Sequence, residues 1–176
     1  MFKKLFGGKK PIQDPNLIDC VTAAGLVVQI GLEKLQAEWP SLKEDIPRYD
    51  EAFGHVEGTW VEYEIFLASL GADLLALYNL FQAEKADELR DALRDFLSNM
   101  ENVGEISVEA VGEYFSVAQL ALQENAFPIE YVASLLLQRL EAPDDVGGPL
   151  LMAGLMQAVG RLVGGWKHIK TTYKVA

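Results

Sequence analysis

Residues 59–82 read TWVEYEIFLASLGADLLALYNLFQ, and their apolar pattern decides the fold class. Large apolar residues recur at alternating spacings of three and four, which is typical of an α-helix. This stripe consists of Trp60, Tyr63, Leu67, Leu70, Leu74, Leu77 and Phe81. Only a narrow strip of Glu62, Ser69 and Asp73 suits solvent. Because a helix that is apolar over most of its circumference must be surrounded by protein, we expect this helix to be the most buried element.

Helical periodicity extends over most of the rest of the chain. Asp14 and Pro15 predict the start of a first helix, and Pro40 predicts its end. Thr59 followed by Glu62 predicts a capping box at the start of the central helix. Further helices are expected over residues 84–100, 107–124, 128–140 and 150–173, and no stretch alternates as a strand would. The sequence therefore predicts an all-α fold, a compact bundle of about five main helices plus a short helix in the 37–58 connector.

The composition fits one globular domain. The chain has 176 residues, of which 50% are hydrophobic, and this is enough to form a core. Four of its lysines lie among the first ten residues, which contain no acid. We therefore expect residues 1–13 to be a flexible basic N-terminal arm and residues 14–176 to be a single helical domain.

The charge balance argues against some partners. The chain has 15 basic and 26 acidic residues, for a net charge of -11, and such a surface repels nucleic acid. Three apolar stretches, 17–32, 65–81 and 150–166, approach the length of a membrane span, but each carries polar side chains, so we interpret them as central helices of a soluble bundle. A lone cysteine, Cys20, is typical of a reducing compartment, and we expect a cytoplasmic protein.

The first ten residues mix bulky apolar and basic side chains. This composition suits a weak contact with a membrane surface or an acidic partner, and the alternatives are a plain soluble arm or a segment folded back on the acidic body. The residues of this contact would be Phe2, Lys3, Lys4, Leu5, Phe6, Lys9 and Lys10.

The 37–58 connector holds the candidate ligand-binding residues, because a connection of this length inside a small domain is often functional. They are Trp39, Tyr49, Phe53 and His55, with Trp60 just beyond. His55 stands among acids, but the chain has no Glu-x-x-His pair, so we expect neither a metal nor another cofactor. Cys20 has no obvious base, and no set of residues predicts a catalytic site.

Residues 150–173 carry a stripe of small residues, Gly154, Ala158, Gly160 and Gly164, that would let another helix approach closely. This helix and the central one are apolar on more than one face, which predicts a homodimer. Arg161 interrupts the stripe and needs Asp73 or Asp19 as a partner, unless its head reaches solvent.

These patterns favour a non-enzymatic helical protein that acts through protein–protein interaction, as an adaptor, a chaperone-like protein or an inhibitor, and that self-associates. The alternative is a small-molecule-binding or enzymatic helical bundle, with an apolar pocket covered by the 37–58 connector and lined by its aromatic residues.

Overall fold

The computed structural model describes residues 14–143, 145, 146 and 148–176. The contacts predicted for residues 1–10, and the flexible arm predicted over residues 1–13, lie outside the described residues, apart from the arm's junction with the domain at Asp14. The described part is all-α, as predicted, with eight helices and two strands of two residues each. In chain order the elements are β1 (Leu17–Ile18), α1 (Cys20–Asp45), α2 (Tyr49–Phe53), α3 (Gly58–Leu80), α4 (Ala83–Ser98), α5 (Gly104–Gln123), α6 (Pro128–Arg139), α7 (Pro149–Leu162), α8 (Gly165–Thr172) and β2 (Lys174–Val175).

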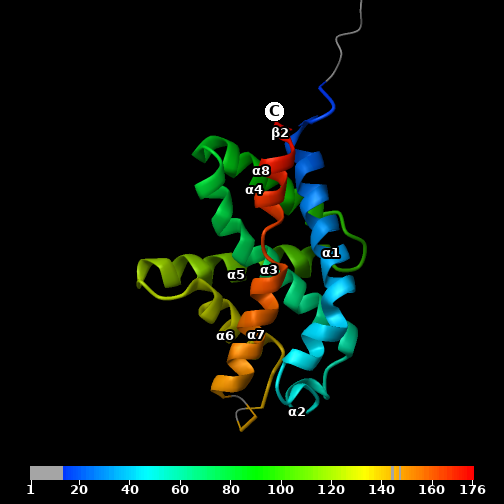
Figure 1. The fold of residues 1–176 in the computed structure, drawn as a ribbon, viewed down its shortest axis with the longest axis vertical. Coiled ribbons are helices and arrows are strands. Elements are labelled where there is room, and N and C mark those ends of the chain that lie inside the picture. The colour runs from blue at the N-terminus through cyan, green and yellow to red at the C-terminus, as the bar shows by residue number, and fades with distance from the viewer. Residues whose placement is uncertain (1–13, 144, 147) are drawn as a thin grey trace, which may run out of the picture.

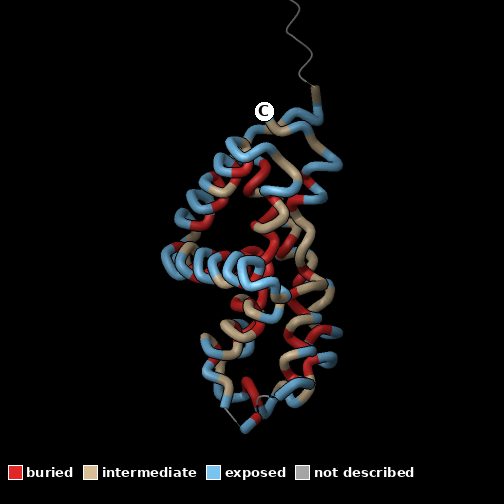
Figure 2. The backbone as a smooth tube through the Cα atoms, turned by 90° about the vertical axis from the view of Figure 1, so that its left-hand side faces the viewer, coloured by how far each residue is buried: buried red, intermediate tan, exposed pale blue. Residues whose placement is uncertain are grey.

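Helix α3 is the centre of the fold, as its sequence predicts. It packs against α1, α4, α5, α6, α7 and α8. Leu67, Leu70, Leu74 and Leu77 are between 0% and 4% exposed. Figure 2 shows the buried residues gathered along the inner sides of the helices, with the exposed residues outside. The predicted capping box at its start is wrong, because Glu57 is the N-cap and the Thr59 hydroxyl donates to the Glu57 carboxylate at 3.0 Å.

Helix α1 runs along one side of the molecule (Figure 1), but it begins later than predicted. Residues 17 and 18 pair in parallel with β2 instead, so the two ends of the described chain lie together. Asp19 is the N-cap and accepts the N–H of Thr22 at 2.7 Å. Asp14 accepts the N–H of Asn16 in a preceding turn. The short parallel pairing could not be predicted, since neither segment is long enough to show alternation.

The predicted end of the first helix at Pro40 is also wrong, because α1 continues through this proline to Asp45. Pro40 is exposed, whereas Leu42 beyond it is fully buried. Arg161 of α7 forms ion pairs with Glu38 at 3.0 Å and Asp45 at 2.9 Å, on either side of the proline. Tertiary contacts therefore hold the last turn in place against the local preference.

The connector contains a short helix, as predicted, but not where the capping pattern of Ser41 and Glu44 predicts it, because these residues belong to the end of α1 and α2 begins at Tyr49.

The single helix predicted over residues 150–173 is two helices, α7 and α8, which are separated at Gly164. Gly164 has a φ of 113°, which favours glycine. The two carboxylate oxygens of Asp73 accept the N–H groups of Gly164 at 2.9 Å and Trp166 at 3.1 Å. Asp73, which the sequence places on the solvent strip of α3, is therefore the buried cap of α8.

No helix in the described residues combines the length and the apolar content that crossing a membrane requires.

Candidate functional site

The structure brings three of the five predicted ligand-binding residues together. The Tyr49 ring lies edge-on to the Trp39 ring, with centroids 6.0 Å apart, and to the Phe53 ring at 5.5 Å. Lys43 Nζ lies over the Tyr49 ring at 4.6 Å. Burial raises the pKa of Tyr49 to about 12, so its hydroxyl stays neutral. Phe53 is part of the core, and the cluster anchors α2 to the end of α1.

The other two predicted residues lie apart from this cluster. Nε2 of His55 lies 3.2 Å from the carbonyl oxygen of Leu140, which follows α6. The Trp60 ring packs on Tyr63, one turn along α3, with centroids 6.0 Å apart. Of the five, only Tyr49 lines the polar hollow beside α2. Ligand binding by these residues stays a prediction, but their contacts are those of packing side chains.

The described residues offer no group of three His, Cys, Asp or Glu side chains that could hold a metal ion. Cys20 lies at the start of α1, with its sulfur 3.7 Å from a Glu88 carboxylate oxygen and 3.9 Å from Lys85 Nζ. Burial raises the pKa of its thiol, so the reactive thiolate is disfavoured.

A groove between α1 and the end of α4 presents apolar side chains at the surface. Its volume is about 650 Å³. It is lined by Val21, Thr22, Gly25, Leu26, Val28, Gln29, Leu32, Glu33, Gln36, Phe96 and Met100. Val21 is 65% exposed and Phe96 36% exposed, so apolar surface at its rim faces solvent. From Val21 to Gln36 the groove follows α1 for about 22 Å, given the helical rise of 1.5 Å per residue.

The residues of the groove give it a defined shape and charge. Gly25 lets the Phe96 ring pack close to the α1 backbone, because a Cβ there would lie 3.1 Å from the ring. Met100 also lines the groove, with a flexible side chain that can adapt to different partners. Gln29 donates to the Glu33 carboxylate at 2.8 Å, which holds this carboxylate at the rim. Among the described residues that line the groove there is no cation. The groove therefore suits an apolar helix face with a basic edge.

The sequence contains a signal for this groove in a second apolar stripe of α1. Helical periodicity places Val21 on the buried face of the first helix and Gln29 on its solvent face. In the structure the buried stripe of α1 passes through Ala24, Val28 and Leu35, and Val21 lies outside it. Leu26 and Leu32 lie on either side of Gln29 in the lining of the groove. These two leucines next to a residue expected in solvent form the second apolar stripe, and they could have indicated the groove from the sequence.

The small stripe of the C-terminal helix is largely used inside the chain, so the face that the sequence offers to a second copy is mostly covered. A Cβ at Gly154 would lie 2.6 Å from Pro47, and Ala158 is buried. Gly160 faces Ile129 of α6. The partners predicted for Arg161 are wrong, since Glu38 and Asp45 take the places of Asp73 and Asp19.

A buried polar network joins α3, α5 and α6. The Glu64 carboxylate, only 1% exposed, accepts the Tyr114 hydroxyl at 2.8 Å and pairs with Nε of Arg139. Nη1 of Arg139 pairs with Glu113 at 2.6 Å. Burial, followed by the neighbouring Glu64 charge, raises the pKa of Tyr114, so the hydroxyl is a fixed donor. The network links three helices and lines neither the groove nor the hollow beside α2, which makes it structural.

Neither a known protein family nor any curated protein or solved structure matches this chain.

Proposed function

We propose that this chain is a non-enzymatic interaction protein whose α1/α4 groove binds an amphipathic helix with basic residues along its edges. The observation that carries the proposal is the groove itself, with an apolar floor, exposed apolar rims and a carboxylate but no cation among its described lining residues.

The dimensions of the groove support a helical occupant. Recognition of a helix in a groove uses apolar anchors at i, i+3, i+4 and i+7. A groove that runs along four turns of α1 offers room for two such repeats. Val21, Phe96 and Met100 would contact the anchors.

Charge supports a basic occupant. Residues 11–176 contain 11 basic and 26 acidic residues, a balance of -15. A surface of this sign attracts basic partners and speeds their association, most strongly at low salt. The roles of adaptor, chaperone-like protein and inhibitor of a basic protein all belong to this proposal. The proposal also includes the cytoplasmic location that is expected from the lone cysteine, Cys20, whose sulfur forms no disulfide.

The test measures binding of a fluorescent 18-residue peptide by anisotropy. The peptide carries Leu at i, i+3, i+4 and i+7 positions and Lys at the flanking positions, and a scrambled peptide of the same composition is the control. We expect the first peptide to bind more tightly, and Val21→Lys to weaken it at least tenfold, because the change removes an anchor contact and adds a like charge. Leu122→Lys is the matched variant, because Leu122 is another exposed apolar residue, on α5, and should not change the affinity.

The proposal would be contradicted if the two peptides bound equally well. It would also be contradicted if the Val21→Lys variant bound the first peptide with the affinity of the unchanged protein. Two further results would assign the groove to another occupant. One is a dimer of the unliganded chain that Val21→Lys dissociates. The other is competition for the groove by a synthetic peptide of residues 1–10.

A further inference from the structure

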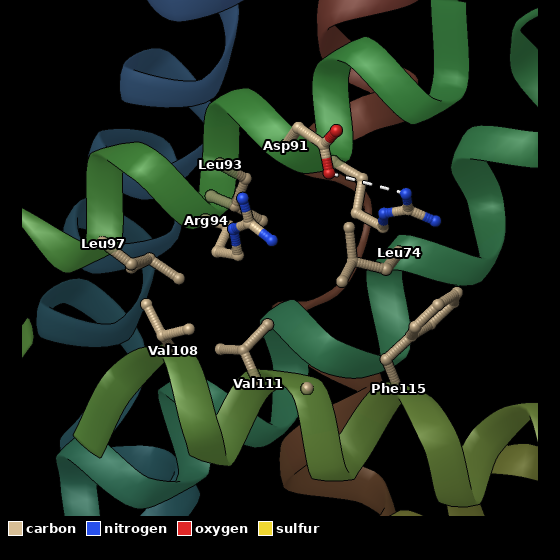
Figure 3. Close-up of a pocket in the computed structure, with 10 residues that line it drawn as sticks. Leu74, Asp91, Leu93, Arg94, Leu97, Val108, Val111 and Phe115 are labelled. Atoms are coloured by element: carbon tan, nitrogen blue, oxygen red, sulfur yellow. Dashed lines mark hydrogen bonds and ion pairs between the residues drawn. The ribbon is translucent and has the colours of Figure 1, made fainter. Parts of the chain in front are cut away.

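A second hollow of about 330 Å³ lies between α3, α4 and α5, away from the α1/α4 groove. Figure 3 shows Leu93 and Leu97 of α4 facing Val108 and Val111 of α5 across this hollow, with Leu74 of α3 and Phe115 at its other side. Most of these side chains are almost completely buried. The hollow is therefore an apolar pocket that reaches into the core.

A glycine lines the pocket where it meets solvent. Gly112 of α5 is exposed, and no heavy atom lies within 4 Å of the position that a Cβ would take there. Elsewhere in the same interface the packing is tight, since a Cβ at Gly71 of α3 would lie 2.4 Å from Tyr114. An apolar hollow of this size that opens to solvent offers a place for the tail of a small ligand.

The mouth of the pocket is polar and carries more positive than negative groups. Its charged lining residues are Arg90, Asp91 and Arg94. Arg90 is held by Asp87 at 3.1 Å and donates to the Tyr78 hydroxyl at 2.7 Å. Its Nη2 also lies 3.5 Å from Asp91, so the charge of Asp91 is partly balanced.

Arg94 differs from Arg90 in its partners. Among the described residues its ion pair is with the exposed Asp95, at 3.8 Å. Such a pair at the surface contributes little. Figure 3 shows Arg94 between Leu93 and Leu97, on the side of α4 that faces α5. A guanidinium at the mouth of an apolar pocket thus keeps most of its donors for a ligand, in a chain whose net charge is -11.

We propose that this pocket binds a small amphipathic carboxylate, such as a medium-chain fatty acid. The apolar tail lies between α4 and α5, and the carboxylate pairs with Arg94. The planar guanidinium matches a carboxylate through two parallel N–H···O bonds. Arg94 has few competing contacts and lies near Asp91, so it suits a ligand with a single negative charge. The volume lies at the lower end of ligand pockets, which favours one short chain.

The test is isothermal titration of the full chain with decanoate, and with decanol as the neutral ligand of the same tail. We expect decanoate to bind at one site per chain and more tightly than decanol. Arg94→Gln should weaken decanoate about fivefold, the size of a partly exposed ion pair, and leave decanol unchanged. Arg48→Gln is the matched control, because Arg48 is another half-exposed arginine paired with an acid, and should have no effect.

The second variant, Gly112→Leu, fills the pocket and should abolish binding of both ligands. Its melting temperature should not fall, since leucine is a better helix former than glycine and the site has space for it. Absence of decanoate binding to the wild type, or unchanged affinity in Gly112→Leu, would overturn the proposal. So would loss of decanoate binding in the groove variant Val21→Lys, because the ligand would then occupy the α1/α4 groove.

Discussion

Gly71 and Gly112 both lie within helices, Gly71 buried and Gly112 exposed, and the same substitution should have opposite effects at the two positions. A Cβ at Gly71 would lie 2.4 Å from Tyr114 Cβ, 3.0 Å from the Val111 carbonyl oxygen and 3.1 Å from the Phe115 nitrogen. Two of these atoms belong to the backbone of α5, so the helices would have to separate. A Cβ at Gly112 meets nothing within 4 Å.

We therefore expect Gly71→Ala to lower the free energy of unfolding by about 2 kcal/mol, because overpacking exceeds the gain in helix propensity. Gly112→Ala should raise it by up to about 1 kcal/mol. Urea denaturation of both variants, followed by circular dichroism, measures the two changes. A loss of stability at Gly112 equal to that at Gly71 would show that the pocket beside α5 is closed.

Asp73 is a second residue with a specific role, and it could not be predicted from periodicity. Its polar character placed it on a solvent strip, whereas its partners are backbone N–H groups 91 and 93 residues away. Local sequence contains no information on such a contact. Gly164 was visible as a small residue, but only the fold shows that its positive φ makes the corner between α7 and α8.

The pH dependence of Asp73→Asn tests this capping role. Burial raises the pKa of the folded carboxyl above its ordinary value of 3.8, against the effect of the N–H donors. The folded protein then keeps the proton over a range above pH 3.8 in which the unfolded chain has lost it, so the stability from Asp73 falls as the pH rises through this range. Asparagine has no such dependence, and its NH2 group, which cannot accept, would face one of the two backbone N–H groups.

We expect Asp73→Asn to be less stable than the wild type by about 1–3 kcal/mol at pH 4, with a difference that narrows toward pH 7. Urea denaturation of both proteins at several pH values measures this difference. A difference that widens as the pH rises would mean that the cap is stabilised by its charge and that its pKa is lowered.

Among the elements, the helix interiors were predictable and several helix ends were not. The strict spacing of α3 and Pro128 at the start of α6 were enough to place those helices. The end of α1 depends instead on Arg161, which pairs on both sides of Pro40 from another helix. The groove was missed for a related reason, because which stripe of α1 is covered depends on where α4 and α8 lie.

The link between α3, α5 and α6 gives a prediction at this scale. Arg139→Ala should lower the free energy of unfolding by about 3–5 kcal/mol, because it leaves the buried Glu64 carboxylate without its cation. The double variant Glu64→Gln with Arg139→Met should recover most of this loss, since the amide oxygen still accepts from Tyr114 and no charge is buried. Chemical denaturation of the single and double variants measures the recovery. A double variant as unstable as Arg139→Ala would assign the loss to packing of the arginine stem.

For the whole molecule, the fold class was predictable because one nearly all-apolar helix requires a surrounding layer. The same pattern also predicted a homodimer, but it contains no information on how many helices of the same chain surround α3. Six helices of the same chain contact α3, and the small stripe of α7 packs on Pro47 and Ile129. Much of the apolar surface of α3 and α7 is therefore buried within one chain.

We accordingly expect the isolated chain to be a monomer, in contrast to the sequence-based prediction. The α1/α4 groove has a carboxylate and no cation among its described lining residues and belongs to a chain of net charge -11, so two copies repel each other at that face. At physiological ionic strength, salt screens the repulsion between charges more than about 8 Å apart. Charged groups that meet at a dimer interface lie closer than this and still repel each other. Light scattering after size exclusion should give a mass near 19.4 kDa across micromolar concentrations. A mass near twice that value would restore the homodimer, and Val21→Lys would then show whether the groove is its interface.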